Sequence, residues 1–458
     1  MPEMSSWVDI QVAVVIDLLV VCLCTVLLLK YARLSHSHPG TIYLFFHVYT
    51  FTYRLIGVSF GAPTMFSQYV MFFEPVTLDE MVRAGLMGDA SLIAMTIAWI
   101  RASVVDLRKT KKLPQQIESS VPNLKLRHIW TVVVVIFPLG LWGLWAFSSL
   151  PGVEGGRTQL GEWQGSSWLL ITQVWSGLAL LALIYWYGFR WWLVSPMVIY
   201  LLMMAIQGYH RFRVVIPALL LIQIYLDRKK LRWPPVYVTA LLLALLAIFF
   251  PLKDIGRMTQ EGENLGQIVD TSRESVNDAM YAAAPDQMFL DEFACAVTLV
   301  DEHGELYYGR TYLNVITLPI PRQWWPDKPS LADYLRDISK PWRPMAEMGM
   351  IVTFLGESYA NFGLFGTLAV PFLVAYWLGR AHFKAYRGSF LSVTRFLYLL
   401  VACNLIQVYR DGLVSIIVFT WVNMMPMMLI VLLHYLGPAK KGDTSPSYAP
   451  SEQTARSG

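Results

Sequence analysis

The sequence contains little charge for its length. Only 15% of its 458 residues are Asp, Glu, Lys or Arg, whereas 55% are hydrophobic and 14% are aromatic. Ordinary soluble proteins carry roughly 25% charged residues, so this composition argues against a soluble globular protein. The formal net charge of +4 does not indicate a nucleic-acid partner, because the basic residues lie in short segments instead of along one face.

Cysteine and the common ligand-binding motifs are also scarce. The four cysteines, Cys22, Cys24, Cys295 and Cys403, lack the spacing of a disulfide framework or a zinc site. The chain contains no CxxC, no HExxH and no GxxxxGKS/T, the motifs that mark redox or zinc sites, metalloproteases and nucleotide-binding loops. We therefore expect no cofactor and no metal ion.

Long apolar runs recur along the chain. A bilayer core needs about 20 apolar residues for each helical crossing, so we predict an all-α polytopic membrane protein with about eleven transmembrane helices (ten to twelve). The predicted spans are 10–29, 41–60, 85–105, 129–149, 167–186, 190–207, 212–226, 234–252, 364–380, 391–409 and 412–436. The first run is predicted to be a span and not a signal peptide, because its leader MPEMSSWVD is acidic.

Basic residues occur in every second loop between these spans. The basic loops carry Lys30 and Arg33; Arg108, Lys109, Lys111, Lys112, Lys125 and Arg127; Arg190; Arg228, Lys229, Lys230 and Arg232; Arg380, Lys384 and Arg387; and Lys440 and Lys441. The positive-inside rule then predicts an external N-terminus and a cytoplasmic C-terminus. The predicted divisions are helices 1–8 in 1–252, a large external loop with short helices in 253–363, helices 9–11 in 364–436, and a disordered cytoplasmic tail in 437–458.

Several basic residues lie on the external side, where the rule disfavours them. They are Arg211, Arg213, Arg257, Arg322, Lys328 and Arg410. A guanidinium group is a planar fork of donors that suits phosphate oxygens, so a convergent set at the membrane surface suits a lipid-linked pyrophosphate. The alternative is that each long side chain extends to the lipid headgroups.

Acidic residues near the same face are candidates for proton transfer. Glu357 lies just before the ninth predicted span, where a half-apolar setting suits a general base. Its alternative role is to complement a helix dipole or hold an arginine. Asp411 directly follows Arg410, and His210 precedes Arg211, where an interfacial structural histidine is the default. The remaining loop acids are expected to form a solvated face: Asp286, Asp291, Glu292, Asp301, Glu302 and Glu305.

The external loop contains the stiff, aromatic stretch LPIPRQWWPDKP at 318–329. Its four prolines restrict the backbone, and Trp324 and Trp325 offer flat faces. Tyr359 and Asn361 lie beside Glu357 in the segment GESYANFG. Aromatic faces stack on sugar rings, but they also anchor proteins at the headgroup level, so either a lid over the substrate or an anchor loop fits this segment.

The run YLNVITLPIPRQWWPDKP (312–329), followed by GESYANFG (356–363), resembles the Wzy-type O-antigen and exopolysaccharide repeat-unit polymerases. The resemblance implies an enzyme of the bacterial inner membrane whose site faces the periplasm. Such an enzyme transfers a glycan from undecaprenyl pyrophosphate to the next lipid-linked repeat unit. The resemblance further implies the bilayer, a chain-length regulator and a flippase as partners.

Site roles follow from the resemblance together with the residue chemistry. The expected catalytic group is Glu357, Arg322, Arg410 and Asp411; the expected substrate-binding group is Arg211, Arg213, Arg257, Lys328, His210, Trp324, Trp325, Tyr359 and Asn361. The alternatives are an O-antigen ligase or another polyprenyl-phosphate glycosyltransferase, for which Asp79 and Glu80 could serve, a flippase or transporter, and a non-catalytic scaffold.

Overall fold

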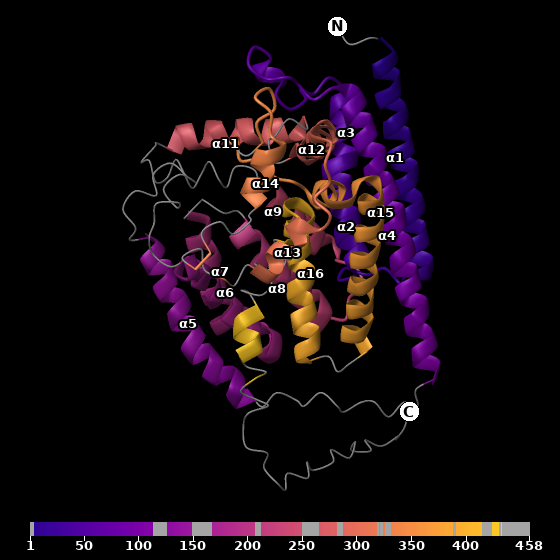
Figure 1. The fold of residues 1–458 in the computed structure, drawn as a ribbon. Helices are drawn as coiled ribbons and strands as arrows, with labels where there is room; N and C mark the ends of the chain where they lie inside the picture. The colour runs from indigo at the N-terminus through magenta and orange to yellow at the C-terminus, as the bar shows by residue number, and fades with distance from the viewer. Residues whose placement is uncertain are drawn as a thin grey trace.

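The protein is all-α in the part of the chain that the structure describes. The computed structural model describes residues 4–112, 126–148, 167–206, 212–249, 265–281, 287–317, 320, 324–325, 331–345, 347–387, 391–414, 424–429 and 432. Within these ranges the regular elements are helices, and the β contact between Lys340 and Arg343 is an isolated bridge (Figure 1).

The first half of the chain forms both long helices and short helical segments. They are α1 (Met4–Tyr31), α2 (Pro39–His47), η1 (Val48–Thr52), α3 (Tyr53–Ser59), η2 (Ser67–Tyr69), α4 (Leu78–Lys112), α5 (Leu126–Ser148), α6 (Ser167–Tyr187), α7 (Trp191–Ile206), α8 (Phe212–Arg228) and α9 (Val236–Phe249). The second half comprises α11 (Leu265–Met280), α12 (Phe289–His303), α13 (Arg310–Thr317), α14 (Leu331–Ile338), α15 (Phe354–Arg387) and α16 (Val393–Asp411).

Three helices are long and apolar enough to cross a membrane: Val8–Tyr31, Leu78–Arg108 and Phe354–Arg387. Shorter apolar helices occupy Val133–Gly143, Val174–Tyr187 and Trp191–Met204. These helices overlap with predicted spans, and the described residues confirm an all-α chain with three helices that are long and apolar enough to cross a membrane. The count of eleven spans and their orientation stay predictions, and most of the last predicted span, 412–436, lies outside the described residues.

One face of α1 is apolar and exposed. Val8, Val12, Val15, Leu19, Leu23 and Val26 are each more than half exposed. They recur every three or four residues, which places them on one side of an α-helix. Such a stripe suits contact with lipid chains.

Two helical segments are interrupted, one within a predicted span and one just before a predicted span. Between α2 and α3, η1 is a π-helix, so the predicted span 41–60 contains a local widening. In α15, Phe362 and Gly363 leave helical geometry, and Gly363 has φ +61. This kink falls at the border between the predicted loop 253–363 and the ninth span.

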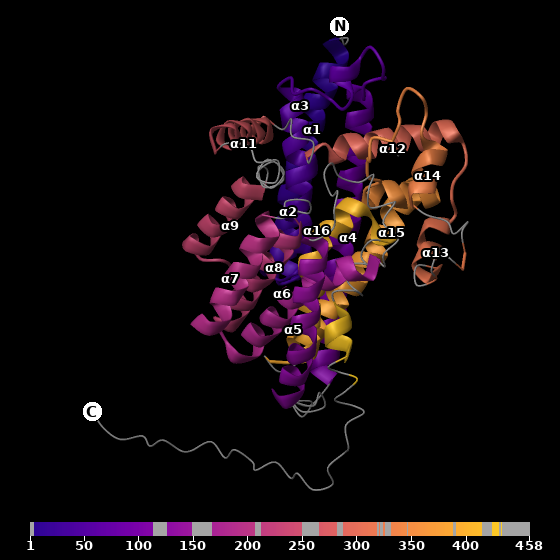
Figure 2. The same ribbon diagram turned by 90° about the vertical axis from the view of Figure 1, so that its left-hand side faces the viewer.

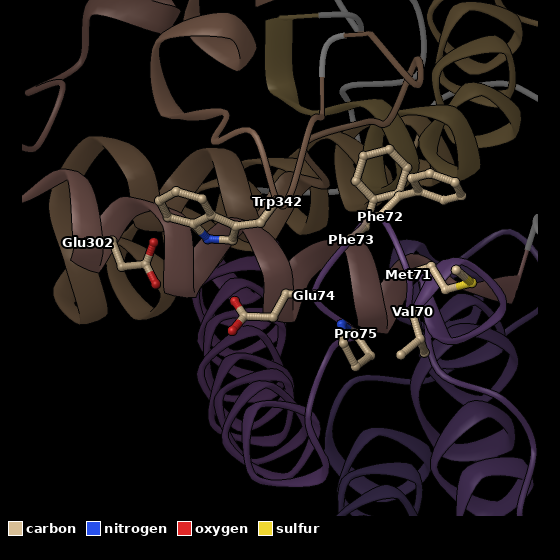
Figure 3. Close-up of a pocket in the computed structure, with 8 residues that line it drawn as sticks. All are labelled: Val70, Met71, Phe72, Phe73, Glu74, Pro75, Glu302 and Trp342. Atoms are coloured by element: carbon tan, nitrogen blue, oxygen red, sulfur yellow. The ribbon is translucent and has the colours of Figure 1, made fainter.

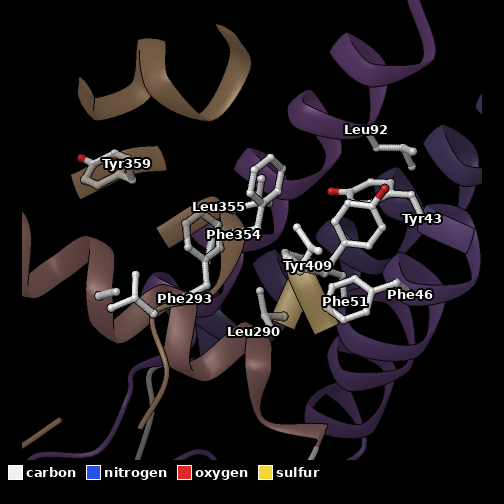
Figure 4. Packing of buried hydrophobic residues seen from close by; sticks show 14 of the residues in the cluster. Tyr43, Phe46, Phe51, Leu92, Leu290, Phe293, Phe354, Leu355, Tyr359 and Tyr409 are labelled. Carbon is white, nitrogen blue, oxygen red and sulfur yellow. The ribbon is translucent and has the colours of Figure 1, made fainter. Parts of the chain in front are cut away.

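Helix α4 is the centre of the first and largest of three hydrophobic cores among the described residues, because it packs along both α1 and α15. Near its end, a Cβ added at Gly379 of α15 would lie 2.9 Å from the Ala102 Cβ and 3.2 Å from the Trp99 ring, so the two helices approach closely there. The second core joins α5 to α8 with α16. Aromatic rings fill the first core, with Tyr43 and Tyr409 at a centroid distance of 4.8 Å (Figure 4).

Short helices cap one end of the bundle. Figures 1 and 2 both place α11, α12 and α14 at the end where α1 begins, away from the C-terminal ends of α4 and α15. Helix α12 is not a peripheral element, because Leu290, Phe293, Cys295 and Leu299 are fully buried in the first core. The cap is therefore packed into the bundle through α12.

The close contact at Gly379 gives a stability prediction. Gly379→Val should lower the Tm of the detergent-solubilised protein, because overpacking a tight helix contact costs about 1–3 kcal/mol. Ala381→Val is the matched control, since Ala381 is exposed on the same helix. Equal Tm values for the two variants, measured by thermal unfolding, would contradict the packing.

Candidate functional site

Three segments meet near the capped end of the bundle: the start of α12, the start of α15 and the end of α16. Helix α16 begins at the N-cap Ser392, whose side chain accepts from the Arg395 N–H. It ends at Asp411 because Gly412 adopts φ +92 and ψ 172, a conformation that only glycine adopts readily. The turn at Gly412 brings the N–H of the next residue, Leu413, into contact with the Glu357 side chain.

Glu357 is buried against this turn. Glu357 is only 1% exposed. Its Oε2 accepts a hydrogen bond from the Leu413 N–H at 2.5 Å. A Cβ at position 412 would lie 2.6 Å from Oε2, so glycine is needed for this approach. The other oxygen, Oε1, has no hydrogen-bond partner among the described residues. It is therefore the atom available to accept a proton.

Arg410 lies on the last turn of α16, two residues before the turn at Gly412. Its guanidinium carbon is 5.0 Å from the ring centre of Phe212 and 5.7 Å from that of Phe289. Cation–π contacts of this kind hold a guanidinium in place without neutralising it. Nε lies 3.5 Å from Asp411 Oδ1, and the side chain is 20% exposed. Gln407 donates to the other Asp411 oxygen at 3.2 Å. The two ring contacts hold the Arg410 guanidinium in position, and its side chain remains partly accessible.

Glu292 of α12 completes the cluster. Burial raises the pKa of its carboxyl to about 8, against the opposing field of Arg410. The negative charges of Asp411 and Asp291 add to the increase. Its Oε2 is buried without a hydrogen-bond partner among the described residues. At neutral pH this carboxyl is predominantly protonated, so it can donate a proton or a hydrogen bond beside the cationic Arg410.

The prediction that Asp291 and Glu292 belong to a solvated face is wrong. Asp291 is fully buried, and both of its carboxylate oxygens accept hydrogen bonds from Arg54. Arg54 Nε donates to Oδ2 and Nη2 donates to Oδ1, each at 2.7 Å. It also accepts from the Met65 N–H at 2.9 Å. The apolar stretch FACAVTLV that follows these acids was the available signal for a buried helix. Asp301, Glu302 and Glu305 are exposed, and Asp286 lies outside the described residues.

Tyr359 and Asn361 make structural contacts. The Tyr359 hydroxyl donates to Asp301 at 2.6 Å and accepts from Arg83 at 3.2 Å. Asn361 donates to Thr311 Oγ1 at 2.6 Å, and its oxygen accepts from the Gly309 N–H at 2.9 Å. These bonds tie the start of α13 to α15 and cover Glu357 from that side.

Of the remaining predicted site residues, only some lie in the part of the chain that the structure describes. Trp324 and Trp325 are exposed, at 81% and 39%. Arg213 lies in α8, and its side chain is not among those that the structure describes. Arg211, His210, Arg257, Arg322 and Lys328 lie outside the described residues, so their convergence with Arg410 stays a prediction.

Glu80, one of the acids considered for a rival glycosyltransferase, has a structural partner. Its Oε1 lies 2.7 Å from Arg343 NH1, and Thr298 donates to the same oxygen at 2.8 Å. The pair anchors the segment after α14 to the start of α4. Asp79 is exposed. The two acids therefore do not act as a matched pair.

A hollow of about 630 Å³ lies beside this anchor. It is lined by Val70, Met71, Phe72, Phe73, Glu74, Pro75, Glu302 and Trp342 (Figure 3). Aromatic faces next to carboxylates suit sugar hydroxyls and rings, and equally suit lipid headgroups. The hollow lies at the capped end of the bundle, and none of the residues that line it belongs to the cluster around Glu292.

Comparisons with protein-family models, with curated proteins and with solved structures gave no match. The functional argument therefore rests on the chain's own residues.

The raised pKa of Glu292 gives a pH prediction. Its pKa rises from 4.5 to about 8 on folding, so the folded state binds a proton that the unfolded state has lost, and stability falls as pH increases through this window. Glu292→Gln lacks this titration. Between pH 5 and pH 8 the wild-type protein should therefore lose stability relative to Glu292→Gln, so that the difference Tm(Glu292→Gln) − Tm(wild type) increases with pH. Glu302→Gln is the matched control on the same helix. A pH-independent difference for Glu292→Gln, measured by thermal unfolding, would contradict the burial.

Proposed function

We propose that the protein is a polyprenyl-pyrophosphate-dependent glycosyltransferase that joins lipid-linked oligosaccharide repeat units into a surface polysaccharide. The observation that carries the proposal is that the end of α16 serves two acids: Arg410 interacts with Glu292, and the turn just after Arg410 binds Glu357. One fixed cation, one protonated carboxyl and one buried carboxylate are the groups that such a transfer needs.

The reaction assigns a role to each group. The acceptor hydroxyl loses its proton to Glu357 Oε1 as its oxygen forms a bond to the anomeric carbon of the donor sugar. The bond from that carbon to the pyrophosphate oxygen breaks, and the electron pair leaves with the pyrophosphate. Arg410 stabilises the negative charge that develops, as a preorganised cation does. Glu292 donates a hydrogen bond to the same leaving group.

Access to Glu357 depends on α13. The bonds of Asn361 to Thr311 and Gly309 hold α13 over the carboxylate. An acceptor sugar therefore reaches Glu357 only after α13 moves away, and its return excludes water, which competes as an acceptor. Arg211, Arg257, Arg322 and Lys328 extend the phosphate-binding surface in this proposal.

The proposed orientation places α11–α14 in the periplasm of a bacterium, with eleven spans in the inner membrane, an external N-terminus and a cytoplasmic C-terminus. The exposed stripe of α1 and the position of the short helices at one end support it. A chain-length regulator and a flippase are the partners that this activity requires.

Thiol labelling checks the orientation. Glu305→Cys should react with a membrane-impermeant maleimide in cells with a permeable outer membrane, because Glu305 is exposed at the capped end. Lys384→Cys, exposed near the other end of α15, should react only after the inner membrane is permeabilised. The reverse pattern would refute the proposed topology.

A ladder assay tests the activity. Purified protein supplied with synthetic lipid-linked repeat units should produce chains of increasing length, and Glu357→Gln and Arg410→Ala should each reduce their formation by about 100-fold or more, as loss of a key electrostatic or proton-transfer group does. Arg336→Ala is the control, since Arg336 is an exposed arginine on α14. Monodisperse variants with wild-type ladders would exclude both residues from the reaction.

A second candidate is a carrier of lipid-linked sugars. The π-helix after α2 and the kink in α15 favour it, because transporters often bind substrates at interrupted helices. In the ladder assay a carrier leaves single repeat units. In proteoliposomes it moves a labelled unit across the bilayer, whereas the polymerase does not.

A further inference from the structure

Three helices of the bundle place metal-binding side chains in one buried space. Asp17 comes from α1, His47 from the end of α2 and Asp89 from α4, and these residues are 1%, 0% and 4% exposed. One ligand atom from each lies within 4.8 Å of the other two. This group is separate from the cluster around Arg410, and the glycosyl transfer proposed above does not use it.

This space holds two carboxyl groups and one imidazole. His47 Nε2 lies 2.8 Å from Asp17 Oδ1 and 3.5 Å from Asp89 Oδ1. Asp17 Oδ2, both oxygens of Asp89 and His47 Nδ1 have no hydrogen-bond partner among the described residues. If both carboxyls are ionised, one imidazolium leaves a buried net negative charge, and that cost is removed either by a proton on one carboxyl or by a bound cation. A divalent cation with a neutral imidazole balances the two carboxylates.

Two further observations point to a ligand. The Tyr43 hydroxyl is buried without a hydrogen-bond partner among the described residues, and it is close enough to Asp89 to interact with its charge. Tyr43 precedes His47 by one helical turn. The π-helix η1 begins directly after His47, and local π-geometry occurs frequently at functional sites. The helix is thus interrupted at the residue that contacts both carboxylates.

The donor set identifies the class of cation. Magnesium and calcium take oxygen ligands, whereas zinc, manganese and related ions accept imidazole nitrogen together with carboxylate oxygen. We propose that Asp17, His47 and Asp89 bind one divalent transition-metal ion inside the helical bundle. The ion connects α1 to α2 and α4, and Tyr43 supplies a hydroxyl beside it. This proposal replaces the expectation that the chain has no metal site.

Metal content and thermal stability test this site without any assay of activity. The full-length protein in detergent is treated with a chelator and then titrated with Zn²⁺ or Mn²⁺. We expect one ion per chain by mass spectrometry and a Tm that rises with the logarithm of free metal, because the ion binds the folded state. Sodium at equal ionic strength should not raise the Tm.

Variants locate the ion. Asp89→Asn and His47→Gln should each abolish the stoichiometric ion and the metal-dependent rise in Tm. Asp106→Asn should keep both, since it removes a carboxylate from the same helix at a position paired with Arg387. The proposal is overturned if folded wild-type protein binds neither metal, if sodium alone raises the Tm, or if both cluster variants retain the ion. The wild-type measurement decides the first two outcomes even when a variant does not fold.

Discussion

The ion pair between Arg54 and Asp291 joins two parts of the chain that are far apart in sequence. Both side chains are completely buried, and the guanidinium also donates to the Pro63 carbonyl at 2.6 Å. Removing one partner of such a pair costs about 3–5 kcal/mol, because the other charge is left without compensation. The pair fixes α12 against α3. Phe289 and Glu292 meet Arg410 only because α12 is held there.

Sequence reasoning predicted the helical class well and the site only in part. The apolar runs of α1, α4 and α15 are long enough to indicate spans by themselves. The pairing of Asp291 with Arg54 was not predictable in this way, because Asp291 lies in the predicted external loop whereas Arg54 lies in the predicted span 41–60. Glu357 and Arg410 were recognised as chemical groups, but the contact of Glu357 with the turn after α16 depends on Gly412, whose conformation no periodic pattern encodes. Glu292 was missed because an acid in an external loop was taken to be solvated.

The structure contains two polar centres, and a layer of aromatic rings lies between them. The ring of Tyr409 lies 4.8 Å from that of Tyr43 and 6.0 Å from that of Phe354. Phe46 lies 5.6 Å from Tyr409 and 6.3 Å from Phe289. Tyr409 directly precedes Arg410, and Tyr43 lies one turn from His47. The layer keeps the two sets of charges apart, so each can be altered with little direct electrostatic effect on the other.

Gly412 has a consequence for how this chain can change over generations. A side chain at position 412 would need the space that the Glu357 carboxylate occupies. It would also strain a backbone with φ +92. Substitutions at positions 357 and 412 are therefore coupled as long as the turn is kept. A larger residue at 412 requires a shorter side chain at 357, and a glutamate at 357 requires glycine at 412. A pair 55 residues apart in sequence thus behaves as one heritable site.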